Sequence, residues 1–401
     1  MLAAIFNPHE NNVDFMLRRE TFASMSSYGA PFMLKPPPEA ASILAYAQTL
    51  KGGGVERVLL RLARNWSDLG RRVTLVIGEA SGPLAAELPP NTSPDIDVRV
   101  LGDASYRGLR AVAGIVGEVS PDLIFCPGNH YTGVALYLRL RLGRRCPPIV
   151  AKVSNRLARN DQGPLASACY RAWLRLHPRF IDHVVAMTPA MRDETIGAMH
   201  IAADRVGIIP NPPAPRVSDA APSWLPAGRF LLGVGRLAPQ KRWDRMIAAL
   251  PRLASDDTHL VILGEGAERA TLEAQVDALG LRGRVHLPGY FPDPRVALGR
   301  AAAVVLTSDF EGVPGVLREA LAEGTPVVST ESSVAVREIV TSRAMGSIVA
   351  PGDDHALIAA LDHWLAPGRA RPDPIAEPGA DSAQRYLDLF DSVVAGSTPR
   401  A

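Results

Sequence analysis

The sequence predicts an α/β protein made of two doubly wound units, and three observations support this prediction. Short apolar or β-branched runs alternate along the chain with stretches of helical spacing, a pattern typical of a parallel sheet with helices on both faces. The alternation occurs twice, over residues 41–210 and again over residues 225–375. Residues 211–224 between them hold four prolines in 14 residues. Because proline has no N–H to give to a helix or sheet, we interpret this segment as a linker.

The first unit opens with an apolar run at 42–47, and its clearest helix follows at 55–69. In that helix Val55, Val58, Leu59, Leu62, Trp66 and Leu69 share one face, and Gly70 supplies the stop signal. The remaining strands of this unit are expected at 73–77, 98–101, 123–126, 148–153, 183–187 and 206–209.

The second unit has the same rhythm, and its strands are expected at 230–235, 259–264, 284–289, 302–308, 326–330 and 346–350. Residues 380–395 predict a last helix that packs back on the first unit. Residues 1–40 have no clear period, so we expect a poorly ordered extension. Ligand sites in doubly wound sheets lie beyond the carboxyl ends of the strands, so we expect a site in the cleft between the two facing units.

Composition excludes several classes of protein. Of the 401 residues 47% are hydrophobic and 21% are charged, which excludes a largely disordered chain. No run of 18 apolar residues occurs, so no membrane-spanning helix is expected. The N-terminus lacks the pattern of a secretory signal. The three cysteines form no C-x-x-C, so we expect neither a disulfide framework nor a zinc site, and we predict a cytoplasmic protein.

The charge is unevenly distributed. Residues 1–215 carry 24 basic and 18 acidic side chains, a net of +6, whereas residues 216–401 have a net of −4. The densest stretch, Arg139 to Arg179, holds ten basic residues and one acid. Apolar residues lie among these arginines, which suggests contact with an anionic membrane surface, although two solvated helices explain the pattern equally well. The apolar residues are Leu138, Leu140, Tyr170, Trp173, Leu174 and Leu176.

The glycine-rich segment KGGGVER at 51–57 follows a strand and opens the helix at 55–69. Gly53 and Gly54 allow the backbone to come close to a ligand, and the N–H groups at a helix start favour phosphate. The segment is not a Walker A loop, and an ordinary strand–helix turn explains it equally well.

Two motifs in the second unit suit a diphosphate and sugar hydroxyls. In VGRLAPQKRWD at 234–244, Arg236 and Lys241 follow the end of a strand, where two cations can clamp a diphosphate. In SDFEGVPGVLREAL at 308–321, Glu311 lies in a loop, and Pro314 suits the first turn of a helix that carries Glu319. Carboxylates beside free amides suit sugar hydroxyls, which both donate and accept hydrogen bonds. The amides expected to be free are those of Val313, Gly315 and Val316.

Polar residues also follow two strands of the first unit. His130, in FCPGNHYTG, could carry a proton or bind a substrate, although a lone histidine is more often structural. Lys152 and Asn155 end the next strand and are expected on the same side. LGEGAER at 263–269 lacks the third glycine of a dinucleotide fingerprint, so a turn and helix cap are expected there.

Taken together, these motifs resemble those of the retaining glycosyltransferases of family 4, the glycosyl transferases group 1, which have the GT-B fold of two facing Rossmann-like domains. The resemblance covers about residues 42–395. It is carried by GGVE at 53–56, GRLAPQK at 235–241 and EGVPGVLREAL at 311–321. The chain departs from the family at ESSVAVREIV, residues 331–340, where a Gly-Gly pair is usual.

The resemblance implies roles for the residues named above. Arg236 and Lys241 would hold the diphosphate of a UDP- or GDP-sugar, and Glu319 its ribose. Glu311, acting with the amides of Val313 to Val316, would hold the sugar hydroxyls. Gly53 and Gly54 would approach the donor phosphates, His130 would lie near the sugar, and Lys152 and Asn155 are placed on the acceptor side. No metal or other cofactor is implied, because Arg and Lys would stabilise the leaving diphosphate.

The sequence thus predicts a retaining hexosyltransferase of cell-envelope or exopolysaccharide assembly, with a glycan or lipid-linked acceptor and possible peripheral membrane contact. A sugar-nucleotide epimerase or phosphorylase on the same fold is less favoured, because GRLAPQK with EGVPGVLREAL favours transfer. An inactive sugar-nucleotide-binding scaffold is the non-catalytic alternative. No nucleic-acid-binding motif or aromatic platform is visible, so no nucleic-acid partner is expected.

Overall fold

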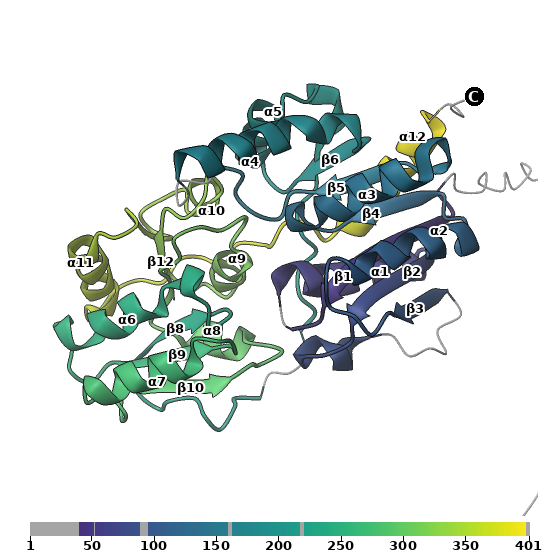
Figure 1. Cartoon of the computed structure of the whole chain (residues 1–401). Coiled ribbons are helices and arrows are strands. Elements are labelled where there is room, and N and C mark those ends of the chain that lie inside the picture. Colours follow the sequence, from purple (N-terminus) through teal and green to yellow (C-terminus); the bar gives the residue numbers. More distant parts are fainter. Residues whose placement is uncertain (1–39, 52, 89–94, 159–162, 217–219, 398–401) are drawn as a thin grey trace, which may run out of the picture. The chain divides into compact units, whose positions relative to one another are not determined.

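The computed structural model describes residues 40–51, 53–88, 95–158, 163–216 and 220–397. Within them lie two parallel sheets with helices packed around each (Figure 1). The extension expected over residues 1–40 lies outside the described residues except for Ala40.

The N-terminal sheet has seven parallel strands in the order β3-β2-β1-β4-β5-β6-β7. The order reverses between β1 and β4, so the loops after these two strands diverge and leave a crevice at the carboxyl edge. The strands are β1 (Ser42–Thr49), β2 (Arg72–Glu79), β3 (Ile96–Val100), β4 (Leu123–Cys126), β5 (Ile149–Lys152), β6 (His183–Ala186) and β7 (Val206–Ile208).

The C-terminal sheet has six parallel strands in the order β10-β9-β8-β11-β12-β13 and reverses in the same way, between β8 and β11. Its strands are β8 (Phe230–Val234), β9 (His259–Leu263), β10 (Val285–Gly289), β11 (Ala303–Leu306), β12 (Val327–Thr330) and β13 (Gly346–Val349). All thirteen strands overlap the predicted runs, and the predicted α/β class with two doubly wound sheets is confirmed.

The α-helices lie mainly between successive strands, as right-handed parallel crossovers require. The predicted helix at 55–69 is α1, which begins one residue earlier. The helices are α1 (Gly54–Asp68), α2 (Val112–Val119), α3 (Thr132–Leu142), α4 (Pro164–Leu176), α5 (Pro189–Met199), α6 (Trp243–Ala249), α7 (Arg269–Ala278), α8 (Arg295–Arg300), α9 (Gly315–Ala322), α10 (Val336–Ile339), α11 (Asp354–Leu365) and α12 (Ser382–Ala395).

The last helix, α12, belongs to the N-terminal core. The ring of Phe390 lies 5.2 Å from that of Trp66 on α1, and the ring of Tyr386 lies 5.5 Å from that of Phe125 on β4. These aromatic residues are fully or almost fully buried. The chain therefore crosses from the first sheet to the second and returns to complete the core of the first.

The basic stretch from Arg139 to Arg179 is not one continuous surface. Leu138 and Leu174, which the membrane hypothesis counted as surface residues, are buried in the core. Leu140 and Leu176 are exposed, and so is Leu165, which the sequence analysis did not select. The expected surface thus reduces to a few leucines and arginines on α3 and α4. No helix in the described part of the chain is long and apolar enough to cross a membrane.

Candidate active site

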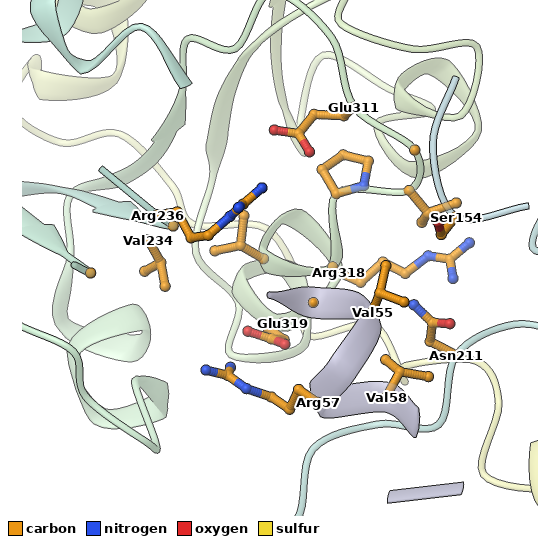
Figure 2. Close-up of a pocket in the computed structure, with 18 of the residues that line it drawn as sticks. Val55, Arg57, Val58, Ser154, Asn211, Val234, Arg236, Glu311, Arg318 and Glu319 are labelled. Atoms are coloured by element: carbon orange, nitrogen blue, oxygen red, sulfur yellow. The ribbon is translucent and has the colours of Figure 1, made fainter. Parts of the chain in front are cut away.

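A pocket of about 290 Å³ is lined by residues from the carboxyl ends of both sheets. It collects most of the predicted site residues, which come from segments far apart in the chain (Figure 2). Those lining it are Gly54, Lys152, Asn155, Arg236, Lys241, Glu311, Val313, Gly315, Val316 and Glu319. Gly53 and His130 are not among the lining residues.

Lys241 and Glu311 form an ion pair in this pocket. The Lys241 Nζ lies 2.6 Å from Glu311 Oε1, and the buried hydroxyl of Ser308 donates to the same oxygen at 2.6 Å. The Thr307 hydroxyl donates to the carbonyl of Lys241 at 3.0 Å and so holds its loop against β11. An ammonium has three N–H donors, so Lys241 can keep this contact and still donate to a ligand.

Arg236 differs from Lys241 because its side chain is exposed and has no ion pair among the described residues. Its backbone is fixed, since the Trp243 indole N–H donates to the Arg236 carbonyl at 3.0 Å. Figure 2 shows its guanidinium extending into the pocket. A fixed backbone with an unpaired guanidinium suits the binding of a phosphate.

Glu319 lies on α9, as predicted, and its carboxylate has no hydrogen-bond partner in the described part of the chain. Burial raises the pKa of Glu319 above its ordinary value, and the nearby Arg61, Arg57 and Arg295 oppose this shift. Arg57, on α1, is drawn with Glu319 in Figure 2. A carboxylate without a fixed partner is available to accept hydroxyl groups from a ligand.

The start of α9 faces the same pocket. The helix begins at Gly315, so Pro314 stands just before it rather than in its first turn as predicted. The amides of Gly315 and Val316 belong to the first turn, where no helical acceptor exists, and the helix dipole places partial positive charge there. Glu311 and these amides thus border the same part of the pocket.

The glycine-rich turn ends at the start of α1, where Gly53 is the N-cap. A Cβ on Gly53 would lie 2.0 Å from the Glu56 carboxylate, whereas a Cβ on Gly54 would meet nothing within 4 Å. The Glu56 carboxylate is the end of a flexible side chain and can move aside, so this contact alone does not require glycine at position 53. Gly54 lines the pocket and leaves open space in front of the backbone.

His130 lies beside the pocket in a small cluster with Tyr131 and Glu56. Its ring centroid is 4.0 Å from that of Tyr131, whose hydroxyl donates to Glu56 Oε1 at 3.0 Å. Although the side chain keeps an exposed edge, partial desolvation lowers the pKa of His130; Glu56 opposes the shift and Arg236 adds to it. The lowered pKa favours the neutral form of the His130 imidazole.

Lys152 is buried at the end of β5, and its ammonium donates to the Asn211 side-chain oxygen. Burial alone lowers the pKa of Lys152 to about 7. Asn155, on the following loop, contacts the other sheet: a Cβ on Gly312 would lie 2.1 Å from the Ser154 carbonyl oxygen and 3.2 Å from the Asn155 Cα. The loop after β5 and the loop after β11 therefore meet backbone to backbone at the edge of the pocket.

The sequence analysis missed several cations that line the pocket. Arg57 and Arg61 lie on α1, and Arg318 precedes Glu319 on α9. Arg57 and Arg61 are four residues apart, the spacing that puts two side chains on one helix face. That spacing was the available signal, but such arginines usually face solvent. Here Arg57 lies over the Tyr290 ring and Arg61 lies beside the Pro212 carbonyl.

The triplet Asp95-Ile96-Asp97 has D-x-D spacing, which in other proteins can hold a metal. Here Ile96 and Asp97 belong to edge strand β3, and Asp97 pairs with Arg99 at 2.7 Å, outside the residues that line the pocket. No group of three or more His, Cys, Asp or Glu side chains is arranged for a metal within the described ranges.

Two doubly wound sheets whose carboxyl ends line one charged pocket are the GT-B architecture. The family model described as "Glycosyl transferases group 1" matches residues 223–376, and that described as "Glycosyltransferase Family 4" matches residues 52–213. The chain belongs to the group 1 glycosyltransferase family, as the resemblance predicted, and is therefore a glycosyltransferase.

Two curated relatives and one solved structure illustrate the similarity. A "GDP-mannose-dependent alpha-mannosyltransferase" of Mycobacterium tuberculosis is 26% identical over 69% of this chain and 72% of its own length. An "N-acetylgalactosamine-N,N'-diacetylbacillosaminyl-diphospho-undecaprenol 4-alpha-N-acetylgalactosaminyltransferase" of Campylobacter jejuni is 32% identical over 41% of this chain and 44% of its own length. HepE of Anabaena, solved with UDP and glucose, has a TM-score of 0.66 at 21% identity, covering 88% of this chain and 96% of that one; this likeness concerns the fold.

Proposed function

We propose that this enzyme transfers a sugar from a nucleotide-diphosphate sugar to a hydroxyl acceptor with retention of anomeric configuration, in the assembly of a cell-envelope or exopolysaccharide glycan. The observation that carries the proposal is the arrangement of Lys241, Glu311 and Arg236 in one pocket: a paired lysine and carboxylate beside an unpaired guanidinium. Such a set supplies both cations for a diphosphate and an acceptor for sugar hydroxyls.

In this proposal Arg236 and Lys241 bind the diphosphate, with Gly54 and the start of α9 close to its oxygens. Glu319 accepts from the ribose hydroxyls, and Glu311, oriented by Ser308 and Lys241, accepts from the sugar. His130, beside the pocket, hydrogen-bonds the sugar. UDP and GDP are the first donors to test, since the names of the M. tuberculosis relative and of the HepE structure mention GDP-mannose and UDP respectively.

The transfer step forms a bond from the acceptor hydroxyl oxygen to the anomeric carbon. The bond from that carbon to the phosphate oxygen breaks on the same face, and the hydroxyl proton passes to the leaving diphosphate. Charge grows on that diphosphate as the bond breaks, so preorganised cations lower the barrier. We propose that Arg236 and Lys241 supply this stabilisation, with no metal ion or other cofactor.

The acceptor is proposed to be lipid-linked, and the name of the C. jejuni relative, with its diphospho-undecaprenol, supports this class. Peripheral attachment to the inner face of the membrane would use α4, where Leu165 and Leu176 are exposed beside Arg171 and Arg175. Sedimentation with phosphatidylglycerol-containing vesicles, but not with phosphatidylcholine vesicles, is expected. The double substitution Leu165→Ser and Leu176→Ser should reduce it, and sedimentation that is unchanged by the substitutions would contradict the role of α4.

A panel of UDP-, GDP- and ADP-sugars tests the proposed function. A donor that binds the folded protein raises the melting temperature by mass action, and turnover releases the nucleoside diphosphate. We expect one nucleotide class to stabilise the wild type and to have a weakened effect on Lys241→Ala and Glu319→Ala. Stabilisation without release would favour the inactive scaffold, and a folded protein that binds no donor would overturn the proposal.

A further inference from the structure

Besides Lys51, Arg57 and Arg236, three cations among the described residues line the pocket with no carboxylate in contact. Lys152 comes from β5, Arg61 from α1 and Arg318 from α9. Within the described ranges none of the three forms an ion pair, whereas Lys241 in the same pocket is 2.6 Å from Glu311. Burial lowers the pKa of each of these three side chains, so each charged form loses hydration that no acid in direct contact replaces.

Two of the three cations are anchored on adjacent residues of the segment that connects the sheets. The Lys152 ammonium donates to the side-chain oxygen of Asn211, and Arg61 Nη1 lies 3.5 Å from the carbonyl oxygen of Pro212. Asn211 and Pro212 line the pocket as well. Lys152 and Arg61 are therefore held at one place by neutral oxygen atoms, and neither forms an ion pair among the described residues. Glu319, Glu87 and Glu377 lie near enough to Arg61 to oppose part of its pKa shift but do not contact it.

Arg318 lies apart from Arg236, which is proposed to bind the donor diphosphate. Figure 2 shows Asn211, Arg318 and Ser154 on one side of the start of α1 and Arg236 on the other. Burying a cation without a partner costs free energy, and a bound anion would offset that cost. Guanidinium groups with an ammonium match the oxygens of a phosphate group, because each supplies several N–H donors.

We propose that Lys152, Arg61 and Arg318 form a binding subsite for the phosphate or diphosphate group of the acceptor. The inference rests on the proposed function and specifies its acceptor, which is a phosphorylated molecule rather than a neutral glycan. The phosphate belongs either to a lipid carrier or to a soluble sugar phosphate, and the same side chains would bind both.

The test is calorimetric titration of the full-length protein with UDP, or the diphosphate that the donor panel selects, kept at saturation. The soluble probe is inorganic pyrophosphate, the lipid probe is undecaprenyl phosphate in phosphatidylcholine nanodiscs, and methyl α-glucoside is the neutral reference. We expect at least one phosphate probe to bind the wild type, and Lys152→Met to weaken it about ten- to a hundredfold, as for a hydrogen bond to a charged group. Nucleotide affinity should be unchanged.

Lys152→Met keeps the aliphatic stem and removes only the charge, so it should fold. Arg318→Gln tests a second contact, with partial rescue expected from Arg318→Lys. Arg343→Met, which removes an exposed cation away from the pocket, is the control for net charge. The lipid and soluble probes distinguish the two sources of the phosphate.

Two results would overturn the inference while leaving the proposed function intact: wild-type protein that binds nucleotide but neither phosphate probe, or a Lys152→Met variant that binds the probe as tightly as wild type. A folded Lys152→Met variant that loses nucleotide would assign Lys152 to the donor site and also overturn it. If the wild type binds no nucleotide, the proposed function itself fails.

Discussion

The lysine on the C-terminal side of the pocket has a charged partner, whereas the lysine on the N-terminal side does not have one among the described residues. On the C-terminal side Lys241 is paired with Glu311 at 2.6 Å, and Ser308 supports the same carboxylate. On the N-terminal side Lys152 is more deeply buried and has only the neutral Asn211 as its partner in the described part of the chain. A paired lysine is stable before any ligand arrives, whereas an unpaired one carries a cost that a ligand can relieve. The same residue type therefore has opposite energetic roles in one pocket.

The largest expected difference between Lys241 and Lys152 is the effect of their substitution on transfer activity. We expect Lys241→Met to lower kcat/KM by about a hundred- to a thousandfold, the usual loss when one donor to developing charge is removed. Lys152→Met should instead raise the KM for the acceptor and leave nucleotide binding unchanged. Steady-state kinetics with each substrate varied in turn provides the measurement. If both substitutions changed nucleotide affinity equally, Lys152 and Lys241 would belong to the same binding site, and the proposed difference between the two sides of the pocket would be wrong.

Removing the two lysines should change the free energy of unfolding in opposite directions. Lys241→Met leaves the Glu311 carboxylate buried without its cation, which should lower the free energy of unfolding by about 3–5 kcal/mol. Adding Glu311→Gln removes the orphaned charge, so the double variant should recover part of that loss. Urea denaturation of the single and double variants gives the coupling. A double variant whose loss equals the sum of the two single losses would show that the pair is not energetically linked.

The pH dependence of stability gives a further test of the unpaired state of Lys152, because this lysine titrates differently in the folded and in the unfolded chain. Its folded pKa of about 7 lies below the ordinary value of 10.5. Between these values the unfolded chain binds more protons, so this group makes stability rise with pH across that window and adds a constant cost below it. Lys152→Met should therefore stabilise the protein below pH 7 by on the order of 5 kcal/mol, less the lost hydrogen bond to Asn211.

The advantage of Lys152→Met should shrink toward zero as the pH approaches 10.5. Melting curves of wild type and variant across that range measure the difference. An advantage that stays constant over the whole range would mean that the Lys152 ammonium is well solvated in the folded protein.

The smallest expected effect on stability is at the contact between the loop after β5 and the loop after β11. A Cβ at Gly312 would lie 2.1 Å from the Ser154 carbonyl oxygen, and the Arg156 amide donates to the Glu311 carbonyl beside it at 3.1 Å. Gly312→Ala must push the two loops apart, at about 1–3 kcal/mol by analogy with overpacked cores. Hydrogen exchange at the Arg156 amide should become faster. Gly133→Ala, on α3 with open space around it, is the matched control and should be neutral or stabilising.

The sequence by itself determined the local structure and the family. All thirteen strands and helix α1 follow from apolar periodicity, and Gly70, at φ +82°, ends that helix where a left-handed residue is needed. The spacing of Glu311 and Glu319 also emerged from sequence alone, because one loop and the helix after it contain both residues. These features depend on neighbours within a few positions along the chain.

Only the tertiary structure decided the charge partners. Lys241 meets Glu311 from 70 positions away and Lys152 meets Asn211 from 59 positions away. The sequence assigned Lys241 and Glu311 to separate parts of a donor and gave Lys152 no partner. It also counted Leu138 and Leu174 as surface residues, although both are buried. Periodicity shows that a residue lies on a face but not what covers that face, since coverage depends on how the sheets and loops pack.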